Sequence, residues 1–372
     1  MKFTISKNIL LENLNYVAKA ISTKNIIPIL NGIKFELNKE GLYLTATDSE
    51  LTIQTFIENK KIKNIEAEGI IIIQSKYLID IVRKMPTDDI NIEVVDGLKI
   101  KIYTTQNQYS LNCLEPKEYP KFKIESSKVP LVLNSDMLKE LINQTAFAIS
   151  TQESRPLLTG INLKITGDIL ELTATDSYRL AKKSIKLPLS IKEDINIVIP
   201  GKNLIEFDKI LNDNDQVEIH IFNSKILFKY KNIIFQSNLL NGTYPNTANL
   251  IPTDFELIVD VSLSDYYDAI DRAALLTQSK DKNIVKMSVE EKNMKISSYA
   301  SEIGKVEETV NIKKNNKNIL DISFSAKYML EALRTIKEDK ILILLNTDIK
   351  PIIIKSVKDE SLIQLILPIK TY

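Results

Sequence analysis

The sequence has one cysteine, one histidine and only nine glycines among 372 residues. A single cysteine, Cys113, excludes a disulfide framework and a thiolate metal cluster. The single histidine, His220, lies in the strand-like segment VEIHIF; histidine bases and histidine metal sites generally need partners that this chain does not supply, so we interpret it as an ordinary strand residue. No glycine-rich phosphate loop and no nucleophile elbow is present. We therefore expect no catalytic residue, no metal site and no cofactor.

Long apolar runs are missing as well. The longest ones, GIIII at 69–73 and ILILL at 341–345, are far shorter than the roughly 18 residues that span a bilayer, and they are typical of buried strands. The first residues lack the apolar segment of a signal peptide, so we expect a cytoplasmic protein without membrane contact. Because the net charge is only +1, any binding of nucleic acid would need individually placed cations.

The chain does contain internal repeats. Its length suggests about two to three domains, and the hexapeptide LTATDS occurs at 44–49 and again at 172–177. The segment at 26–37, IIPILNGIKFEL, matches SRPLLTGINLKI at 154–165 with the same offset, so the unit is predicted to be strand, turn, strand. Catalytic acid pairs need different environments, whereas Asp48 and Asp176 have identical ones. A degraded third copy, ISSYASE at 296–302, carries Ala300 instead, so we interpret the aspartates as structural.

Two helices are predicted in each repeat. One set, SKYLIDIVRKM at 75–85, GKNLIEFDKIL at 201–211 and AKYMLEALRTI at 326–336, has apolar residues at helical spacing and a shared pattern of base, acid and base. Two interpretations stay open for these charges: a surface of intrahelical ion pairs, or a face turned towards phosphates. The other set covers 6–23, 134–150 and 262–277, with Ser6, Asn134 and Ser262 as N-caps.

The repeats define three domains. Tyr-Pro recurs at 119–120 and 244–245, where the strand periodicity lapses. We expect an α+β fold of three tandem copies, each with two helices and some eight short strands: the N-terminal repeat (residues 1–125), the central repeat (126–249) and the C-terminal repeat (250–372).

These features resemble a known family. Three copies of a two-helix, strand-rich unit, TATDSYRLA at 173–181, the two Tyr-Pro boundaries and the apolar tail LILPIKTY are similar to the bacterial sliding clamp family, the beta subunits of DNA polymerase III, over the whole chain. The resemblance implies a head-to-tail homodimeric ring with helices inside and sheets outside. Such a ring encircles double-stranded DNA without reading its sequence, tethers the polymerase and has no catalytic activity.

The resemblance also implies partners and sites. The partners would be DNA, a second copy, the DNA polymerase III alpha subunit, the clamp loader delta subunit, and other polymerases and repair proteins that bind through short linear motifs. The DNA-facing residues would be Lys24, Lys76, Arg83, Thr151, Gln152, Lys202, Lys209, Lys327 and Arg334. The partner-peptide pocket would comprise Leu158, Thr175, Ser177, Tyr178, Arg179, Leu180, Pro245, Leu250, Tyr328, Ile366, Leu367, Pro368 and Ile369. The dimer interface would comprise Tyr109, Leu111, Leu275, Leu276, Glu302, Glu307 and Glu308.

The sequence departs from the family pattern in places. Ser177 and Tyr178 stand where members often have Gly and His, and Gln106 and Gln108 stand where well-known members have arginine. Core packing is the alternative for Leu158 and Leu180, and Lys76 could serve DNA or the interface. Two other functions remain open: a tandem-repeat scaffold that never encloses DNA, which predicts a monomer, and an enzyme that uses the two repeated aspartates, which predicts activity lost on replacing either.

Overall fold

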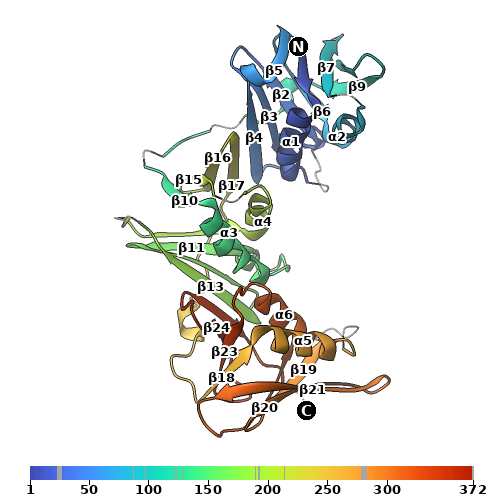
Figure 1. Cartoon of the computed structure of the whole chain (residues 1–372). Helices are drawn as coiled ribbons and strands as arrows, with labels where there is room; N and C mark the ends of the chain where they lie inside the picture. The colour runs from blue at the N-terminus through green and yellow to red at the C-terminus, as the bar shows by residue number, and fades with distance from the viewer. Residues whose placement is uncertain are drawn as a thin grey trace. The chain divides into compact units, whose positions relative to one another are not determined.

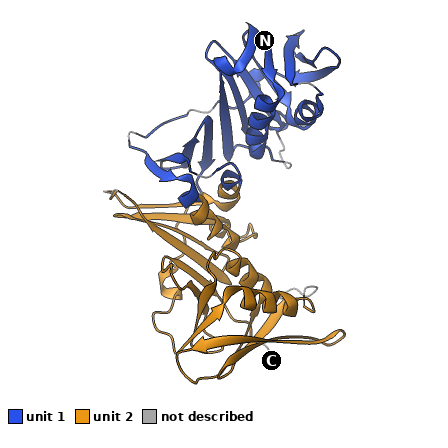
Figure 2. Cartoon of the chain, viewed as in Figure 1, with its two compact units in different colours: residues 1–138, 206–239 blue, residues 139–205, 240–372 orange. Residues whose placement is uncertain are grey.

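The chain folds into two compact units, each built on one antiparallel sheet. The computed structural model describes residues 1–22, 27–86, 88–96, 98–121, 124–127, 129–188, 190–191, 193–212, 214–277 and 283–370. Residues 1–138 and 206–239 form unit 1, and residues 139–205 and 240–372 form unit 2 (Figure 2). The central repeat therefore contributes to both units, and the division falls within its two helices, α3 and α4.

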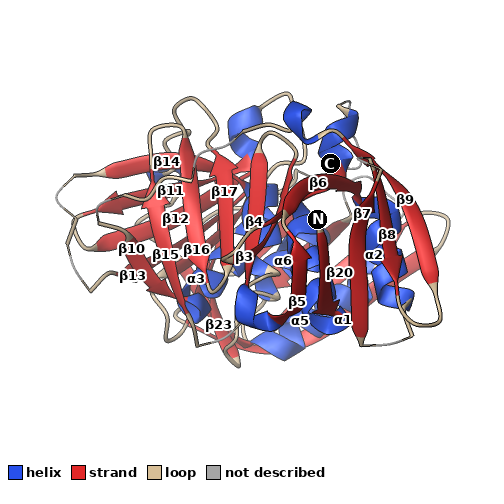
Figure 3. Cartoon of the chain, turned by 90° about the horizontal axis from the view of Figure 1, so that it is seen from above, coloured by secondary structure: helices blue, strands red, loops and turns tan. Residues whose placement is uncertain are grey.

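Strands predominate in every repeat (Figure 3). The N-terminal repeat has β1 (Lys2–Ser6), α1 (Lys7–Val17), β2 (Gly32–Leu37), β3 (Gly41–Thr47), β4 (Leu51–Glu58), β5 (Ile62–Ala67), β6 (Gly69–Gln74), α2 (Ser75–Lys84), β7 (Asp89–Val95), β8 (Lys99–Tyr103) and β9 (Gln108–Leu114). The central repeat has β10 (Leu131–Asn134), α3 (Ser135–Asn143), β11 (Gly160–Thr166), β12 (Ile169–Thr175), β13 (Arg179–Lys186), β14 (Ile195–Pro200), α4 (Gly201–Asp208), β15 (Gln216–Ile221), β16 (Lys225–Tyr230) and β17 (Ile233–Asn238). The C-terminal repeat has β18 (Leu257–Ser262), α5 (Leu263–Ala274), β19 (Ile284–Val289), β20 (Asn293–Ala300), β21 (Gly304–Lys314), β22 (Leu320–Ser325), α6 (Ala326–Leu333), β23 (Lys340–Leu345), β24 (Ile352–Ser356) and β25 (Leu362–Ile366).

The six predicted helices are confirmed, but each is shorter than its sequence pattern. The segment at 6–23 forms α1 and then a single 3-10 turn, Ala18–Ala20, and the segment at 134–150 ends similarly. The tightening has a local cause in α3, where the Thr145 hydroxyl donates to the Leu141 carbonyl at 2.7 Å and competes with the helical bond. Asn134 and Ser262 cap their helices by accepting an N–H, whereas Ser6 occupies the cap position without a side-chain bond.

The helices of the N-terminal and C-terminal repeats pack in pairs and against their sheet. In the N-terminal repeat α1 contacts α2, and in the C-terminal repeat α5 contacts α6 (Figure 1). The C-terminal core beneath α5 and α6 includes Tyr266, Met329 and Phe324, none of which is more than 1% exposed. The apolar runs GIIII and ILILL lie in β6 and β23, as predicted, and His220 lies buried in β15. No helix in the described ranges is long and apolar enough to cross a membrane.

The sheets continue from one repeat into the next. In unit 1 the strand order is β10-β15-β16-β17-β4-β3-β2-β6-β9-β8-β7-β1-β5, so β17 of the central repeat pairs with β4 of the N-terminal repeat. In unit 2 the order is β14-β11-β12-β13-β25-β24-β23-β18-β21-β20-β19-β22, so β13 pairs with β25 of the C-terminal repeat. We call the β4–β17 contact the first junction and the β13–β25 contact the second junction. Each junction removes two exposed strand edges, whose unpaired N–H and C=O groups would otherwise invite aggregation.

Candidate functional site

The second copy of the hexapeptide forms a tight turn at the second junction. The side chain of Asp176 accepts the N–H groups of Tyr178 and Arg179 at 2.9 and 3.0 Å, while the Thr175 hydroxyl donates to the Arg179 carbonyl at 2.6 Å. Ser177 takes a positive φ of 78°, a conformation that few residues other than glycine adopt. The Thr175 N–H donates to the phenol of Tyr244 at 3.0 Å. Together these bonds present the side chain of Tyr178 outwards, where it is 60% exposed.

Arg179 points the other way and is buried. Its guanidinium pairs with Asp176 at 3.0 Å and with Glu331 of α6, and it stacks on the rings of Tyr328 and Phe147 at 4.4 and 5.3 Å. A planar cation suits this position because it can bind two carboxylates and stack on aromatic faces at the same time. Arg179 therefore connects the turn of the second hexapeptide to the helix that carries Tyr328.

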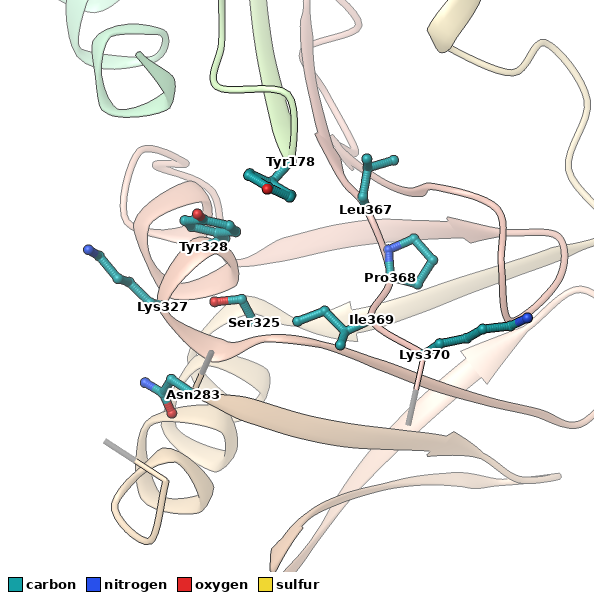
Figure 4. A pocket seen from close by; sticks show the side chains of 9 residues that line it. All are labelled: Tyr178, Asn283, Ser325, Lys327, Tyr328, Leu367, Pro368, Ile369 and Lys370. Atoms are coloured by element: carbon teal, nitrogen blue, oxygen red, sulfur yellow. The ribbon is translucent and has the colours of Figure 1, made fainter. Parts of the chain in front are cut away.

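An open pocket of about 680 Å³ lies next to Tyr178, and we call it the aromatic pocket (Figure 4). The rings of Tyr178 and Tyr328 stack with their centroids 6.5 Å apart. Burial, with the carboxylate of Asp176 nearby, raises the pKa of the Tyr328 phenol, which therefore stays protonated at neutral pH. The pocket is lined by Tyr178, Asn283, Ser325, Lys327, Tyr328, Leu367, Pro368, Ile369 and Lys370.

A second pocket of about 540 Å³ lies on the other side of the same turn, and we call it the aliphatic pocket. Its wall is mostly apolar, and Leu157 and Leu158 pack with Tyr244 behind it. Arg155 donates to the Ser177 hydroxyl at 3.1 Å and so closes one side. The lining residues are Arg155, Pro156, Leu157, Leu158, Thr175, Ser177, Pro245, Thr247 and Leu250.

The predicted pocket residues thus gather around one turn, but in two pockets. Leu158, Thr175, Ser177, Pro245 and Leu250 line the aliphatic pocket, and Tyr178, Tyr328, Leu367, Pro368 and Ile369 line the aromatic pocket.

Three predicted residues, Arg179, Leu180 and Ile366, line neither pocket and are buried beneath them. For Leu180 the core-packing alternative holds: it is 2% exposed and belongs to an apolar cluster with Leu365.

Several lining residues were missed by the sequence reasoning. Ser325 and Lys370 lie within three residues of the predicted Tyr328 and Ile369 in the sequence, and this proximity could have identified them. Pro156 lies in the repeated segment 154–165, so the repeat could have identified it. Asn283 had no such signal because it reaches the aromatic pocket only through the fold.

The predicted DNA-facing residues are exposed wherever the structure describes them. Lys24 lies outside the described residues; the exposed ones are Lys76, Arg83, Thr151, Gln152, Lys202, Lys209, Lys327 and Arg334. The ion-pair interpretation holds for two of them, since Arg83 pairs with Asp80 at 2.9 Å and Lys209 with Glu206 at 2.5 Å.

In the C-terminal repeat the ion-pair pattern fails. Glu331 pairs with Arg179, and Arg334 donates instead to the phenol of Tyr267 at 2.7 Å. Lys327 lines the aromatic pocket, a position that the DNA-facing interpretation did not anticipate.

The predicted interface residues lie at two open sheet edges. Tyr109 and Leu111 belong to β9, whose residues 108–112 pair with β8 on one side and with no described strand on the other. Over residues 304–311, β21 likewise pairs only with β20 in the part of the chain that the structure describes. Leu275, beside it at the end of α5, is 61% exposed.

The remaining predicted interface residues are Leu276 and three acids of the C-terminal repeat. Leu276 is half-buried, and Glu302 is exposed in the turn between β20 and β21. Glu307 pairs with Lys305 and Glu308 with Arg272. Two of the three predicted interface acids thus already have a cation within the chain.

Comparison with known proteins gives a consistent result along the whole chain. Three family models match: DNA polymerase III beta subunit, N-terminal domain, over residues 1–123, the central domain over 132–246 and the C-terminal domain over 248–370. The beta sliding clamp of Bacillus subtilis (strain 168) is 41% identical over 378 residues, and that of Staphylococcus aureus is 37% identical over 377 residues; each match covers 100% of both chains. Among solved structures, the DNA polymerase sliding clamp from Bacillus subtilis superposes with a TM-score of 0.96 at 40% identity and the beta subunit from Streptococcus pyogenes with 0.94 at 31%, each over 100% of both chains.

Proposed function

Because the chain belongs to the DNA polymerase III beta subunit family of sliding clamps, we propose that it encircles duplex DNA as a head-to-tail dimeric ring and tethers the replicative polymerase. It is a processivity factor and not an enzyme. The alternatives of a scaffold that never encloses DNA and of an aspartate-dependent enzyme are not favoured by any relative. We propose the domain boundaries 1–125, 126–249 and 250–372, and we propose that the protein works in the cytoplasm, where bacterial DNA is replicated.

The observation that carries the ring is that two equivalent junctions lie within the chain while the strands that would form a third have open edges. Within the chain, β4 and β13 each pair with the last strand of the next repeat, β17 or β25. By position in the repeat, β21 corresponds to β4 and β13, and β9 corresponds to β17 and β25. Both β21 and β9 have an open edge among the described residues. A third junction between β21 of one protomer and β9 of its partner would use both edges, and applying it twice closes a ring.

The residue at one helix position supports the same third junction. Lys19 follows α1, Phe147 follows α3 and Leu275 follows α5, with 128 residues between successive members. Lys19 pairs with Glu206 of the next repeat, and Phe147 packs against the C-terminal core, so both contact the repeat that follows. Leu275 has no following repeat in its own chain, and its exposure is what a contact with a second protomer requires.

The proposed contacts with DNA are weak because they involve a few exposed cations that bind phosphates. The exposed cations Lys76 and Lys202 occupy the same position on equivalent helices, and Arg334 directly follows the corresponding helix of the C-terminal repeat, so each repeat can offer a cation to phosphates. Contacts with phosphates position a protein without selecting a sequence, and they weaken with salt. Thr151 and Gln152 are exposed and uncharged and extend this surface. Lys24 is assigned to it by the family resemblance alone.

The two pockets form the proposed partner site. Together they offer an aromatic and an aliphatic cavity separated by Ser177 and Tyr178, which suits a short linear segment with two apolar anchors. We propose that the polymerase alpha subunit, the clamp loader delta subunit, and other polymerases and repair proteins insert such segments here.

The test of encirclement is a comparison of circular with linear duplex DNA. The protein is loaded on nicked circular DNA with its clamp loader, and retention after gel filtration is measured at increasing salt. Retention on the circle should survive salt that screens phosphate contacts, and cutting the circle should release the protein. Equal loss from both DNA forms would show that the protein is not topologically linked to DNA.

A further inference from the structure

The walls of the two pockets carry charge of one sign. Their charged lining residues are Arg155, Lys327 and Lys370, and no lining residue is acidic. The chain as a whole is balanced, with 49 basic and 48 acidic residues, so a wall with three cations and no carboxylate is not a reflection of composition.

The two carboxylates that pair with Arg179 do not offset this charge. Asp176 and Glu331 lie beneath the pockets, and both are held by Arg179. Counting these two acids against Arg179 and the three lining cations, four positive groups against two negative ones leave a net charge of +2. An incoming segment therefore meets a positive rim, while the two partly buried carboxylates are already paired with Arg179.

Two of the cations bracket the aromatic pocket. Lys327 directly precedes Tyr328 on α6, and Lys370 follows the tail residues that form the opposite wall, so the two ammonium groups lie on opposite sides of the cavity (Figure 4). Both residues are exposed, and no carboxylate among the described residues lies within 4.0 Å of either ammonium. The side chains are therefore available to a ligand at both ends of the pocket.

We propose that these lysines select partner segments that carry acidic side chains on both sides of their apolar and aromatic anchors. The inference rests on the proposed partner site and adds to it the charge of the ligand. The anchors fill the pockets by burial, and each flanking carboxylate lies towards one lysine. Lysine acts here as a flexible point charge on a solvated rim, so it favours acidic flanks without imposing a single geometry. An exposed ion pair contributes up to about 1 kcal/mol, and the upper half of that range, about 0.5 to 1 kcal/mol, corresponds to roughly two- to fivefold in affinity for each flank.

The test uses four fluorescein-labelled peptides with the core of the polymerase alpha-subunit tail. Their flanks are serine on both sides, aspartate before the core, aspartate after the core, or lysine on both sides. Fluorescence anisotropy with the full-length protein at about 0.1 M salt should give the order aspartate, serine, lysine, with about two- to fivefold between steps. The differences should vanish near 1 M salt, where the screening length is about 3 Å.

Charge reversal identifies the responsible residues. Lys327→Glu should reverse the preference at one flank and Lys370→Glu at the other, while Lys327→Gln and Lys370→Gln should only abolish it. Lys292→Glu, at an exposed lysine in the turn between β19 and β20 and outside both pockets, is the matched control and should change nothing. Light scattering of each variant checks that it has the parent's oligomeric state.

The outcomes separate this inference from the proposed function. If the serine-flanked peptide binds, but the flanks and both charge reversals have no effect, the charge selection is wrong and the partner site stands. If no peptide binds the parent protein, the partner site itself is wrong.

Discussion

Each of the two junctions within the chain has a glutamate at the same helix position, but the cation that pairs with it comes from a different element in each case. At the first junction, Glu206 of α4 pairs with Lys19, which follows α1, at 3.4 Å. At the second junction, Glu331 occupies the equivalent position of α6, and its partner is Arg179 of β13. The acid at the same helix position thus links two repeats at both junctions. The cations that bind it, Lys19 and Arg179, are not at equivalent positions of the repeat.

The difference is a compensated exchange of two residues. Lys19 corresponds to Phe147 and Leu51 corresponds to Arg179, each 128 residues apart. At the first junction the cation follows the helix and the strand supplies Leu51, which is buried; at the second, Phe147 follows the helix and the strand supplies the cation. Each junction therefore retains one cation that links its acid to the other repeat and one apolar side chain, and at the first junction Lys209, which follows α4, pairs with the same acid. Only the second arrangement puts a guanidinium under the ring of Tyr328.

The exchange also explains how one hexapeptide serves two purposes. In the first copy Asp48 accepts the N–H groups of Glu50 and Leu51 at 3.0 and 2.7 Å, and Ser49 has a φ of 80°, so the turn is the same as in the second copy. What differs is the two residues that follow the turn: Glu50 and the buried Leu51 in the first copy, Tyr178 and the paired Arg179 in the second. The framework interpretation of the repeated aspartate is confirmed by its bonds to the backbone.

The largest effect is expected at the third junction, which the comparison places between protomers. Replacing Leu275 and Leu276 together by aspartate should produce a folded monomer, because two leucines buried on association contribute about 1.5 to 3 kcal/mol each and a desolvated charge adds to the loss. Sedimentation equilibrium measures the dimer dissociation constant. Lys19→Asp, the same helix position at the first junction, is the control and should leave the dimer intact; an unchanged dimer of the leucine variant would contradict the third junction.

A smaller effect is expected from removing the exchanged cation. Arg179→Leu, which copies the first junction, leaves Asp176 and Glu331 without their partner and should destabilise unit 2 by about 3 kcal/mol. Because Arg179 also supports Tyr328, affinity for an alpha-subunit tail peptide should fall at least tenfold. Urea unfolding and fluorescence anisotropy measure the two quantities.

The matched variant for Arg179→Leu is Leu51→Ala at the equivalent position. It should cost about 2 to 3 kcal/mol through the cavity it leaves, with peptide affinity unchanged. Equal losses of affinity in both variants would mean that the two junctions do not differ in the way proposed.

The next effect concerns the tail that follows β25. Deleting residues 368–372 removes one wall of the aromatic pocket and should weaken peptide binding by about tenfold, or roughly 1.4 kcal/mol. The dimer should persist, since β9 and β21 are untouched. Parent-like affinity of the truncated protein would locate the partner site elsewhere.

The smallest effect is expected at the first hexapeptide. Asp48→Ala removes an acceptor for two backbone N–H groups at an exposed turn, so the free energy of unfolding should fall by about 1 kcal/mol. Peptide affinity should stay at the parent value, because the first turn borders neither pocket. A loss of affinity would show that the two copies are not functionally distinct.

The sequence by itself determined the repeat, its helices and its turns. These features depend on contacts between residues close in the chain: apolar residues at helical spacing, caps such as Ser262, and the Asp-Ser turn of LTATDS, which forms twice with nearly the same φ. Hydrogen bonds between residues close in the chain depend only on which residues are present and how far apart they are in the sequence. The same hexapeptide therefore forms the same turn in both copies.

Only the tertiary structure decided which charges meet. Spacing allowed Glu331 to pair with Arg334, three residues away, as one of two open interpretations. It pairs instead with Arg179, 152 residues earlier, because the β13–β25 pairing brings that guanidinium to α6. The tertiary structure likewise divides the predicted partner-peptide pocket into two, with Ser177 lining one pocket and Tyr178 the other. A buried cation adjacent to two carboxylates and two rings outweighs an exposed intrahelical pair worth a few tenths of a kcal/mol, and burial is a property that sequence spacing does not encode.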